Sequence, residues 1–207
     1  MENLLTIMRR LRGPGGCPWD QKQSHASLRE HLLEEAAEAV DAISADDTAA
    51  MVEELGDVLL QVAFHAVIAE ESQRFHYPAI EQSIVEKLIR RHPHIFGDAQ
   101  AQDADEVLRN WQRIKAEEKA AAGHKVDDPA AAVPQHLPTL MRAAALGKAL
   151  QWPSASAQDL QQALAAPLDN PEEHIGTLLL AVVDYARSLG VNPDIALREA
   201  LEARKSP

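Results

Sequence analysis

The stretch that decides the fold is residues 52–69, which read Val52-Glu-Glu-Leu-Gly-Asp-Val-Leu-Leu-Gln-Val-Ala-Phe-His-Ala-Val-Ile-Ala69. Placed on a helix of 3.6 residues per turn, its apolar side chains point in nearly every direction. We therefore expect a helix from about residue 46 to 72, buried on most of its sides. Its polar interruptions Glu54, Asp57 and Gln61 follow at i, i+3 and i+7, so they share one stripe.

The rest of the chain also favours helix. It has 207 residues, of which 36 are alanine and 24 are leucine, and only 4% are aromatic. Strands prefer β-branched and aromatic residues, and no sustained alternation of apolar and polar residues is present. We predict an all-α protein of the helical-bundle type. Further helices are expected at 2–12, from Ser24 or Ser27 to Ser44, and at 79–92, 103–121, 139–151, 157–166, 172–189 and 193–205.

Two domains are predicted around a linker. Residues 122–138 hold three prolines among small residues, which is typical of a linker and separates a domain at 1–121 from one at 139–207. The two predicted domains share a weak sequence repeat. Residues 54–63 of the first align with residues 174–183 of the second, 120 positions later. The shared stretch is short, so chance similarity between two apolar helices stays an alternative.

The helix predicted to end at Ser44 carries a group of acidic residues in its second half, namely Glu34, Glu35, Glu38 and Asp41. At 100° per residue, Glu35 falls in the middle of an apolar stripe and Glu38 on its flank, whereas Glu34 and Asp41 point to solvent. The stripe itself is formed by Leu28, Leu32, Ala39 and Ile43. A carboxylate centred on an apolar face is costly unless it is paired or bound to a metal.

Two of these acids are expected to face two acids of the next helix. The connection at 45–48 is short, and short connections make antiparallel neighbours, so Glu35 and Glu38 would oppose Glu54 and Asp57. Four oxygen ligands without cysteine or histidine suit a hard cation such as Mg²⁺ or Mn²⁺. Iron is not expected, because carboxylate di-iron bundles use a Glu-x-x-His pattern that this chain lacks.

Basic residues form a second group. Lys87, Arg90 and Arg91 share one face of the helix at 79–92, and Lys115 lies on the next helix. In a chain with a net charge of −12, such a triplet is compatible with an anionic ligand, and arginine forks suit phosphate. Taken alone, pairing of the triplet with Glu81, Glu86 or solvent is the simpler interpretation. The same charge argues against non-specific binding of nucleic acid or anionic membranes. Together the two groups indicate a metal-bound phosphate ester.

The remaining features exclude other classes. The single cysteine, Cys17, permits no internal disulfide and no cysteine-rich zinc site, and we interpret it as structural. No apolar run approaches the ~18 residues of a membrane span. The first residues lack a basic region followed by an apolar stretch, so we expect no signal peptide and a cytoplasmic location.

At this point the residues resemble a family. Glu34-Glu35-x-x-Glu38 followed by Glu54-x-x-Asp57 resembles the signature of the all-α nucleoside triphosphate pyrophosphohydrolases, and the likeness is greatest to the MazG family. Further motifs resemble that family in the same order over roughly residues 3–120. They are Leu4–Arg12, Gly16-Cys-Pro-Trp-Asp20, Lys87-x-x-Arg-Arg-His-Pro-His-x-Phe96 and Trp111-x-x-Ile-Lys-x-Glu-Glu118.

The resemblance implies Mg²⁺-dependent hydrolysis of nucleoside triphosphates to the monophosphate and pyrophosphate. The four acids would bind the metal, and a general base would come from Glu34, Glu35 or Glu38. Phosphates would contact Lys87, Arg90, Arg91 and Lys115. Trp111 would be placed to touch the nucleoside, whereas we interpret Trp19 as a loop anchor. The family also implies a four-helix-bundle-like domain and a homodimer with sites near the subunit contact.

The second copy departs from the family pattern. Gln161, Gln162 and Ala165 stand where Glu-Glu-x-x-Glu is expected, and His174 and Thr177 replace Glu-x-x-Asp. We therefore predict a degenerate second MazG-like domain that binds no metal and serves packing or dimerisation. Two alternatives stay open: a pyrophosphohydrolase of one specialised nucleotide, such as dUTP, dCTP or phosphoribosyl-ATP, and a non-catalytic helical interaction or regulatory protein.

Overall fold

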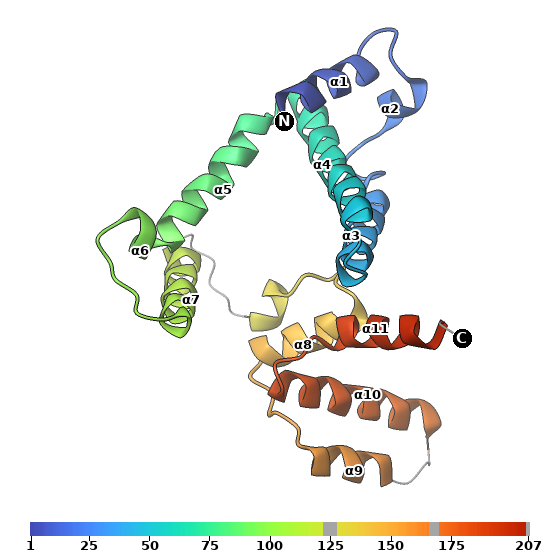
Figure 1. Ribbon diagram of the computed structural model, residues 1–207, viewed down its shortest axis with the longest axis vertical. Helices are drawn as coiled ribbons and strands as arrows, with labels where there is room; N and C mark the ends of the chain where they lie inside the picture. Colours follow the sequence, from blue (N-terminus) through green and yellow to red (C-terminus); the bar gives the residue numbers. More distant parts are fainter. Residues whose placement is uncertain (122–127, 166–169, 206–207) are drawn as a thin grey trace. The chain divides into compact units, whose positions relative to one another are not determined.

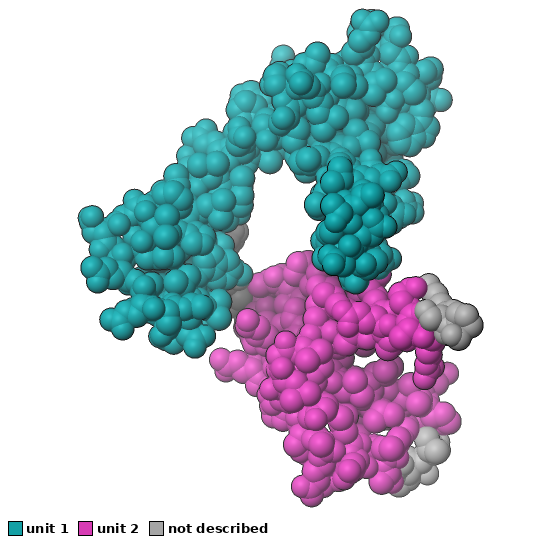
Figure 2. Space-filling view, viewed as in Figure 1, with its two compact units in different colours: residues 1–118 teal, residues 119–207 magenta. Residues whose placement is uncertain are grey.

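The computed structural model describes residues 1–121, 128–165 and 170–205, and every regular element in these ranges is a helix (Figure 1). The prediction of an all-α protein is confirmed. The chain divides into two compact units, Met1–Glu118 and Lys119–Pro207 (Figure 2). None of the described helices is both long and apolar enough to cross a membrane. Within the predicted linker, residues 122–127 lie outside the described residues, and residues 129–132 form a 3-10 turn, η1, that packs against the following helix.

The first unit follows the predicted order of helices, with two short additions. Its helices are α1 (Glu2–Arg12), α2 (Pro18–Lys22), α3 (Arg29–Ser44), α4 (Thr48–Glu71), α5 (Tyr77–Arg91), α6 (Pro93–Phe96) and α7 (Ala104–Ala121). The one-turn helices α2 and α6 were not expected. Helix α3 begins later than either predicted serine cap, because the Ser24 and Ser27 hydroxyls each accept the other residue's backbone N–H in a separate turn.

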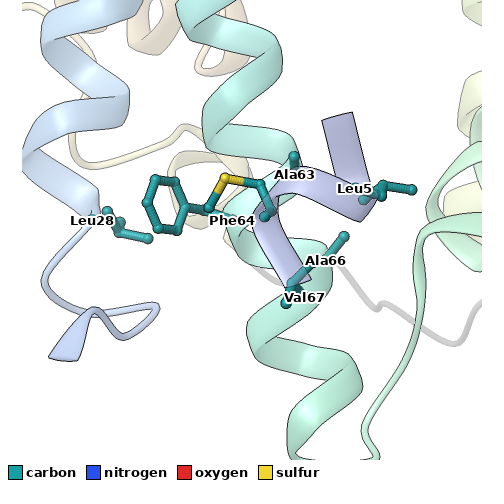
Figure 3. Close-up of a cluster of buried hydrophobic side chains, with 7 residues drawn as sticks. Leu5, Leu28, Ala63, Phe64, Ala66 and Val67 are labelled. Atoms are coloured by element: carbon teal, nitrogen blue, oxygen red, sulfur yellow. The ribbon is translucent and has the colours of Figure 1, made fainter. Parts of the chain in front are cut away.

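Helix α4 is the centre of the first unit. It packs against α1, α3 and α5, and its N-terminus is capped by Asp47, whose carboxylate accepts the N–H groups of Ala49 and Ala50. The core forms where α1 and the start of α3 meet the second half of α4 (Figure 3). Its buried side chains are Leu5, Met8, Leu28, Ala63, Phe64, Ala66 and Val67.

The first half of α4 differs from the prediction of burial on most sides. Val52 is 72% exposed, and Leu55 and Leu59 are each 49% exposed. These side chains are apolar, as the sequence pattern requires, but among the described residues only α3 packs closely against this half of α4. The same holds on α3, where Ile43 is exposed although it lies on the predicted apolar stripe. The sequence pattern therefore marks faces that this chain alone leaves open.

The second unit contains α8 (Thr139–Ala149), α9 (Ala157–Ala165), α10 (Pro171–Ser188) and α11 (Pro193–Lys205). Helix α10 packs against α8, α9 and α11, as α4 packs against α1, α3 and α5. This shared packing order accompanies the sequence repeat. One contact is specific to the second unit: the Arg187 guanidinium crosses α8 at Gly147, donates to the Asp184 carboxylate and reaches the Trp152 carbonyl at 3.3 Å.

Candidate active site

Helices α3 and α4, joined by residues 45–47, bring three of the predicted acids together. Carboxylate oxygens of Glu35, Glu38 and Glu54 all lie within 4.8 Å of one another. The fourth predicted ligand, Asp57, lies close enough to contribute to the pKa shifts of both Glu35 and Glu54. The structure therefore brings Glu35 and Glu38 of α3 to Glu54 of α4, with Asp57 near Glu35 and Glu54.

The acids perturb one another. The pKa of Glu35 is raised, first by burial and then by the charges of Asp57 and Glu38. The pKa of Glu54 is also raised, by partial loss of solvent and by the charge of Glu38. Like charges held this close disfavour ionisation, and a bound cation relieves them. An all-oxygen donor set of this kind fits a hard divalent ion such as Mg²⁺.

Gln61 belongs to the same stripe and was not among the predicted site residues. Its side chain is only 3% exposed, and its hydrogen bond to Glu35 favours the ionised form of that carboxylate. The Gln61 Oε1 atom is buried and has no hydrogen-bond partner within the part of the chain that the structure describes. Buried amide oxygens are normally satisfied, so this orphaned acceptor beside the acids is a second sign that the site is completed by something the chain does not supply.

Glu34 lies outside this cluster. It is exposed, and its Oε2 atom is 3.1 Å from Nδ1 of His31, one turn earlier on α3. Helical phase predicted this solvent-facing position. The position of each side chain now distinguishes the three candidates for a general base. Glu35 and Glu38 belong to the carboxylate cluster, and Glu34 does not.

The basic residues gather on α5 and α7. Arg90 Nε is 2.5 Å from Glu118 Oε1, and Arg91 Nη2 is 2.6 Å from Glu118 Oε2. These hydrogen bonds, with that of Arg91 the stronger, lower the pKa of Glu118 to about 2. Glu118 is the partner that sequence reasoning missed; it ends the Trp111 motif, but nothing in its spacing showed that it would reach α5.

Trp111 organises the same cluster. The Arg91 guanidinium carbon lies 4.9 Å from the centroid of the indole ring, and the Lys115 ammonium lies 5.0 Å from it. Both are within the range of cation–π attraction. Lys87, half-buried on α5, has no ion-pair partner among the described residues. The structure thus joins Arg90, Arg91, Trp111 and Lys115 into one group, which we call the cationic cluster.

The two groups do not meet within the described chain. No described ion pair joins an acid of the carboxylate cluster to a residue of the cationic cluster, and α7 packs closely against neither α3 nor α4. Each group therefore offers half of what a metal-bound phosphate ester needs: oxygen ligands on α3 and α4, and cations on α5 and α7.

Arg12 is an anchor of this segment that the sequence did not single out. Its side chain is only 5% exposed, it donates to the carbonyl oxygens of Asp20 and Gln23, and its other nitrogens bind the Glu71 carboxylate. A buried guanidinium can bind several carbonyl groups at once. Trp19, which we interpreted as a loop anchor, is 54% exposed, and its ring contacts the buried Phe64 at an edge.

Comparisons with known proteins identify the family to which the chain is similar. The MazG nucleotide pyrophosphohydrolase domain matches residues 23–96. Nucleoside triphosphate pyrophosphohydrolase of Escherichia coli (strain K12) is 40% identical over 221 residues, which cover 98% of this chain and 83% of that protein. Nucleoside triphosphate pyrophosphohydrolase/pyrophosphatase MazG of Thermotoga maritima is 38% identical over 96% of this chain and 80% of its own. A crystal structure of a mazG-related protein from Thermotoga maritima is 32% identical, with a TM-score of 0.48, over 56% of this chain and 99% of that one.

Proposed function

Because the chain belongs to the MazG family, we propose that it hydrolyses nucleoside triphosphates to nucleoside monophosphates and pyrophosphate in a reaction that depends on Mg²⁺. The observation that carries the proposal is the carboxylate cluster of Glu35, Glu38 and Glu54, with Asp57 beside it. Mutually repelling acids on a packed helix interface have little structural purpose without a cation.

Glu35, Glu38, Glu54 and Asp57 would hold the metal. Mg²⁺ bound there would polarise phosphate oxygens and lower the pKa of a bound water, and Mn²⁺ is a chemically similar substitute. In the reaction, water attacks the α-phosphorus. The bond between the α-phosphorus and the oxygen that bridges it to the β-phosphorus breaks, and pyrophosphate leaves with that oxygen. The proton of the water passes to a carboxylate. Glu35 and Glu38 are the candidates for this base, since Glu34 pairs with His31.

The cationic cluster and Lys87 would bind the departing phosphates. Arg90, Arg91 and Lys115 offer fixed positive charge where negative charge develops on the leaving group. In the free protein Glu118 occupies both arginines. A phosphate must therefore displace this carboxylate or share the arginines with it, and Glu118 acts as an internal stand-in for the anionic ligand.

We further propose a homodimer. Apolar residues stand open on α4 and also on α5, where Ile84, Val85, Leu88 and Ile89 are each more than two-fifths exposed. Contiguous open apolar faces of this kind mark interaction surfaces. A second copy would cover them, and it would supply a route for the cationic cluster of one protomer to approach the carboxylate cluster of its partner.

The test is pyrophosphate release from a panel of ribo- and deoxyribonucleoside triphosphates, with products separated by chromatography. We expect equimolar monophosphate and pyrophosphate with Mg²⁺ and none with EDTA; release of inorganic phosphate would contradict the proposal. Glu38→Gln and Asp57→Asn should each lower turnover by roughly two orders of magnitude. Glu30→Gln, an exposed acid of the same helix, is the matched control and should change nothing.

Metal binding and assembly are measured separately. Mg²⁺ at ten times its Kd should stabilise the fold by about 1.4 kcal/mol, raising the Tm of the wild type and of Glu30→Gln but not that of Glu38→Gln. Light scattering should give twice the chain mass, and Leu59→Asp on the open face of α4 should return the monomer mass. A wild-type monomer at micromolar concentration would refute the dimer.

A further inference from the structure

The imidazole rings of His25 and His65 form a hydrogen-bonded pair that the proposed hydrolysis does not use. His25 lies in the segment between α2 and α3, and His65 lies on α4. We propose that this histidine pair is a pH-sensitive switch, which holds the start of α3 to α4 near neutral pH and releases it when both rings become charged. The inference goes beyond the proposed function and does not require it, because it concerns the fold around the pair.

The two rings meet edge to edge. Their Nδ1 atoms are 2.7 Å apart, the ring planes differ by only 6°, and the ring centroids are 5.0 Å apart. Faces in van der Waals contact stay about 3.5 Å apart, so parallel rings with atoms at 2.7 Å do not lie face to face. One Nδ1–H therefore donates to the other Nδ1 close to the common plane of the rings, which is a well-aligned hydrogen bond.

This hydrogen bond leaves room for only one proton between the two Nδ1 atoms. In the neutral pair one ring donates, and the accepting ring carries its own proton on Nε2. A first added proton binds Nε2 of the donating ring and leaves the bond intact. A second added proton has to bind the accepting Nδ1, because both nitrogens of an imidazolium carry protons. Two N–H groups and two positive charges then face each other, so the contact breaks.

The surroundings of the pair disfavour protonation. The pKa of His65 is lowered, first by burial and then by the charge of His25. Over the described part of the chain, no carboxylate pairs with either ring, and the His25 Nε2 atom is buried without a hydrogen-bond partner. A charged His25 would therefore bury an N–H group that has nothing to donate to, which costs more than the same group in water.

The charged groups near the pair do not offset a positive charge on it. A cavity of about 560 Å³ beside His25 is lined by Glu71 and Arg74, together with serine, alanine and isoleucine side chains. Glu71 is already bound by the buried guanidinium of Arg12 from α1. Arg74 is a further cation, and Arg29 at the start of α3 donates to a backbone carbonyl. The cavity gives a released His25 ring both space and solvent.

The pair lies at the point where α3 enters the core of the first unit. Leu28, three residues after His25, is fully buried, and His65 directly follows the buried Phe64. The hydrogen bond joins two segments that are 40 residues apart in sequence. Its loss therefore frees the start of α3 from α4. Because α3 also carries two acids of the carboxylate cluster, release at its start loosens the helix that presents them.

Proton linkage gives the direction and the size of the effect. The intact pair binds at most one added proton, whereas both released rings titrate near the ordinary histidine pKa of 6.5. Below this pH the released form therefore binds at least one more proton than the paired form, so acid favours release and neutral pH favours the pair. The population of the released form should rise roughly tenfold for each unit by which the pH falls below about 6.5.

Hydrogen exchange followed by mass spectrometry tests the switch in the full chain. The informative peptides contain Leu28 and Leu32, whose N–H groups donate to the carbonyls of Ser24 and Leu28. They are compared at pH 7.5 and pH 5.5 after correction for the intrinsic exchange rate. Their protection in the wild type should fall roughly tenfold at pH 5.5, while peptides from α10 keep theirs.

Two variants separate the pair from general effects of acid. His65→Gln should remove most of the fall, because an amide does not titrate and can donate to His25 Nδ1 or accept from it. His76→Gln is the matched control, since His76 is an exposed histidine of the first unit whose side chain makes no capping hydrogen bond. It should behave like the wild type.

Nitrogen NMR of the wild type gives a measurement that needs no variant. A scalar coupling between the Nδ1 nuclei of His25 and His65 should be present at pH 7.5 and should disappear as the second ring becomes charged. Absence of this coupling at pH 7.5 would overturn the inference. So would equal protection of the wild type at the two pH values, or the same acid-dependent fall in His65→Gln. None of these results depends on nucleotide hydrolysis, so they leave the proposed function to its own test.

Discussion

Two arginines of α1 offer a matched test of what fixes the Trp19 loop. Arg9 and Arg12 each pair with a glutamate at the end of α4, Glu70 and Glu71. Arg9 is 39% exposed and its described partners are carboxylates, whereas Arg12 is 5% exposed and also binds two backbone carbonyl groups. We expect Arg12→Ala to destabilise the protein far more than Arg9→Ala.

The magnitudes follow from the contacts. The ion pair of either arginine with its half-exposed glutamate contributes about 0.2–1 kcal/mol. Arg12→Ala also leaves the Asp20 and Gln23 carbonyls without this donor, at about 1 kcal/mol each when solvent reaches them in part. The sum is about 2–3 kcal/mol for Arg12→Ala against less than about 1 kcal/mol for Arg9→Ala.

The assay is urea unfolding followed by circular dichroism, with the wild type and both variants at one protein concentration and pH 7. Equal shifts of the unfolding midpoint for the two variants would refute the assignment of Arg12 as the anchor.

The remaining predictions concern one carboxylate and two glycines. Since the pKa of Glu118 is lowered from 4.5 to about 2, its contribution to stability is complete above pH 4.5 and is lost as the pH falls toward 2. Glu118→Gln should flatten that part of the profile of unfolding midpoint against pH, and an unchanged acid slope would contradict the pairing. Gly147→Ala should destabilise the second unit by about 1–3 kcal/mol, because the added Cβ would displace the Arg187 guanidinium from the Asp184 carboxylate and the Trp152 carbonyl. Gly176→Ala meets open space on a helix and should stabilise by about 0.5–1 kcal/mol; thermal shifts of the same sign for the two glycines would refute this reasoning.

The carboxylate cluster was predictable because helical phase is a local property. The angle between Glu35 and the apolar residues of α3 depends only on their spacing, and the short 45–47 connection then determined which helix α4 would face. The same arithmetic placed Glu34 in solvent, where the structure has it. The helices that the sequence missed, α2 and α6, are too short for periodicity to show, and each begins at a proline in the first turn.

Burial was less predictable, because it depends on partners that a pattern does not name. Apolar residues on all sides of α4 predict that other helices pack against it, but they do not predict whether those helices belong to this chain or to another. Leu55 and Leu59 are open for that reason. Glu118 is the same case for charge: its attachment to α5 spans 27 residues or more in sequence, and no spacing rule connects two helices at that distance.

The two tryptophans show why residue type alone does not assign a role. Both lie in motifs that resemble the family, and both are aromatic side chains near charged groups. Arg91 and Lys115 each lie about 5 Å from the centroid of the Trp111 ring, so this ring positions cations. Trp19, on α2, meets His31 of α3 and Phe64 of α4 at steep angles, so its ring packs against neighbouring helices. The neighbours, which only folding assembles, therefore make one tryptophan a support for cations and the other a packing contact between helices.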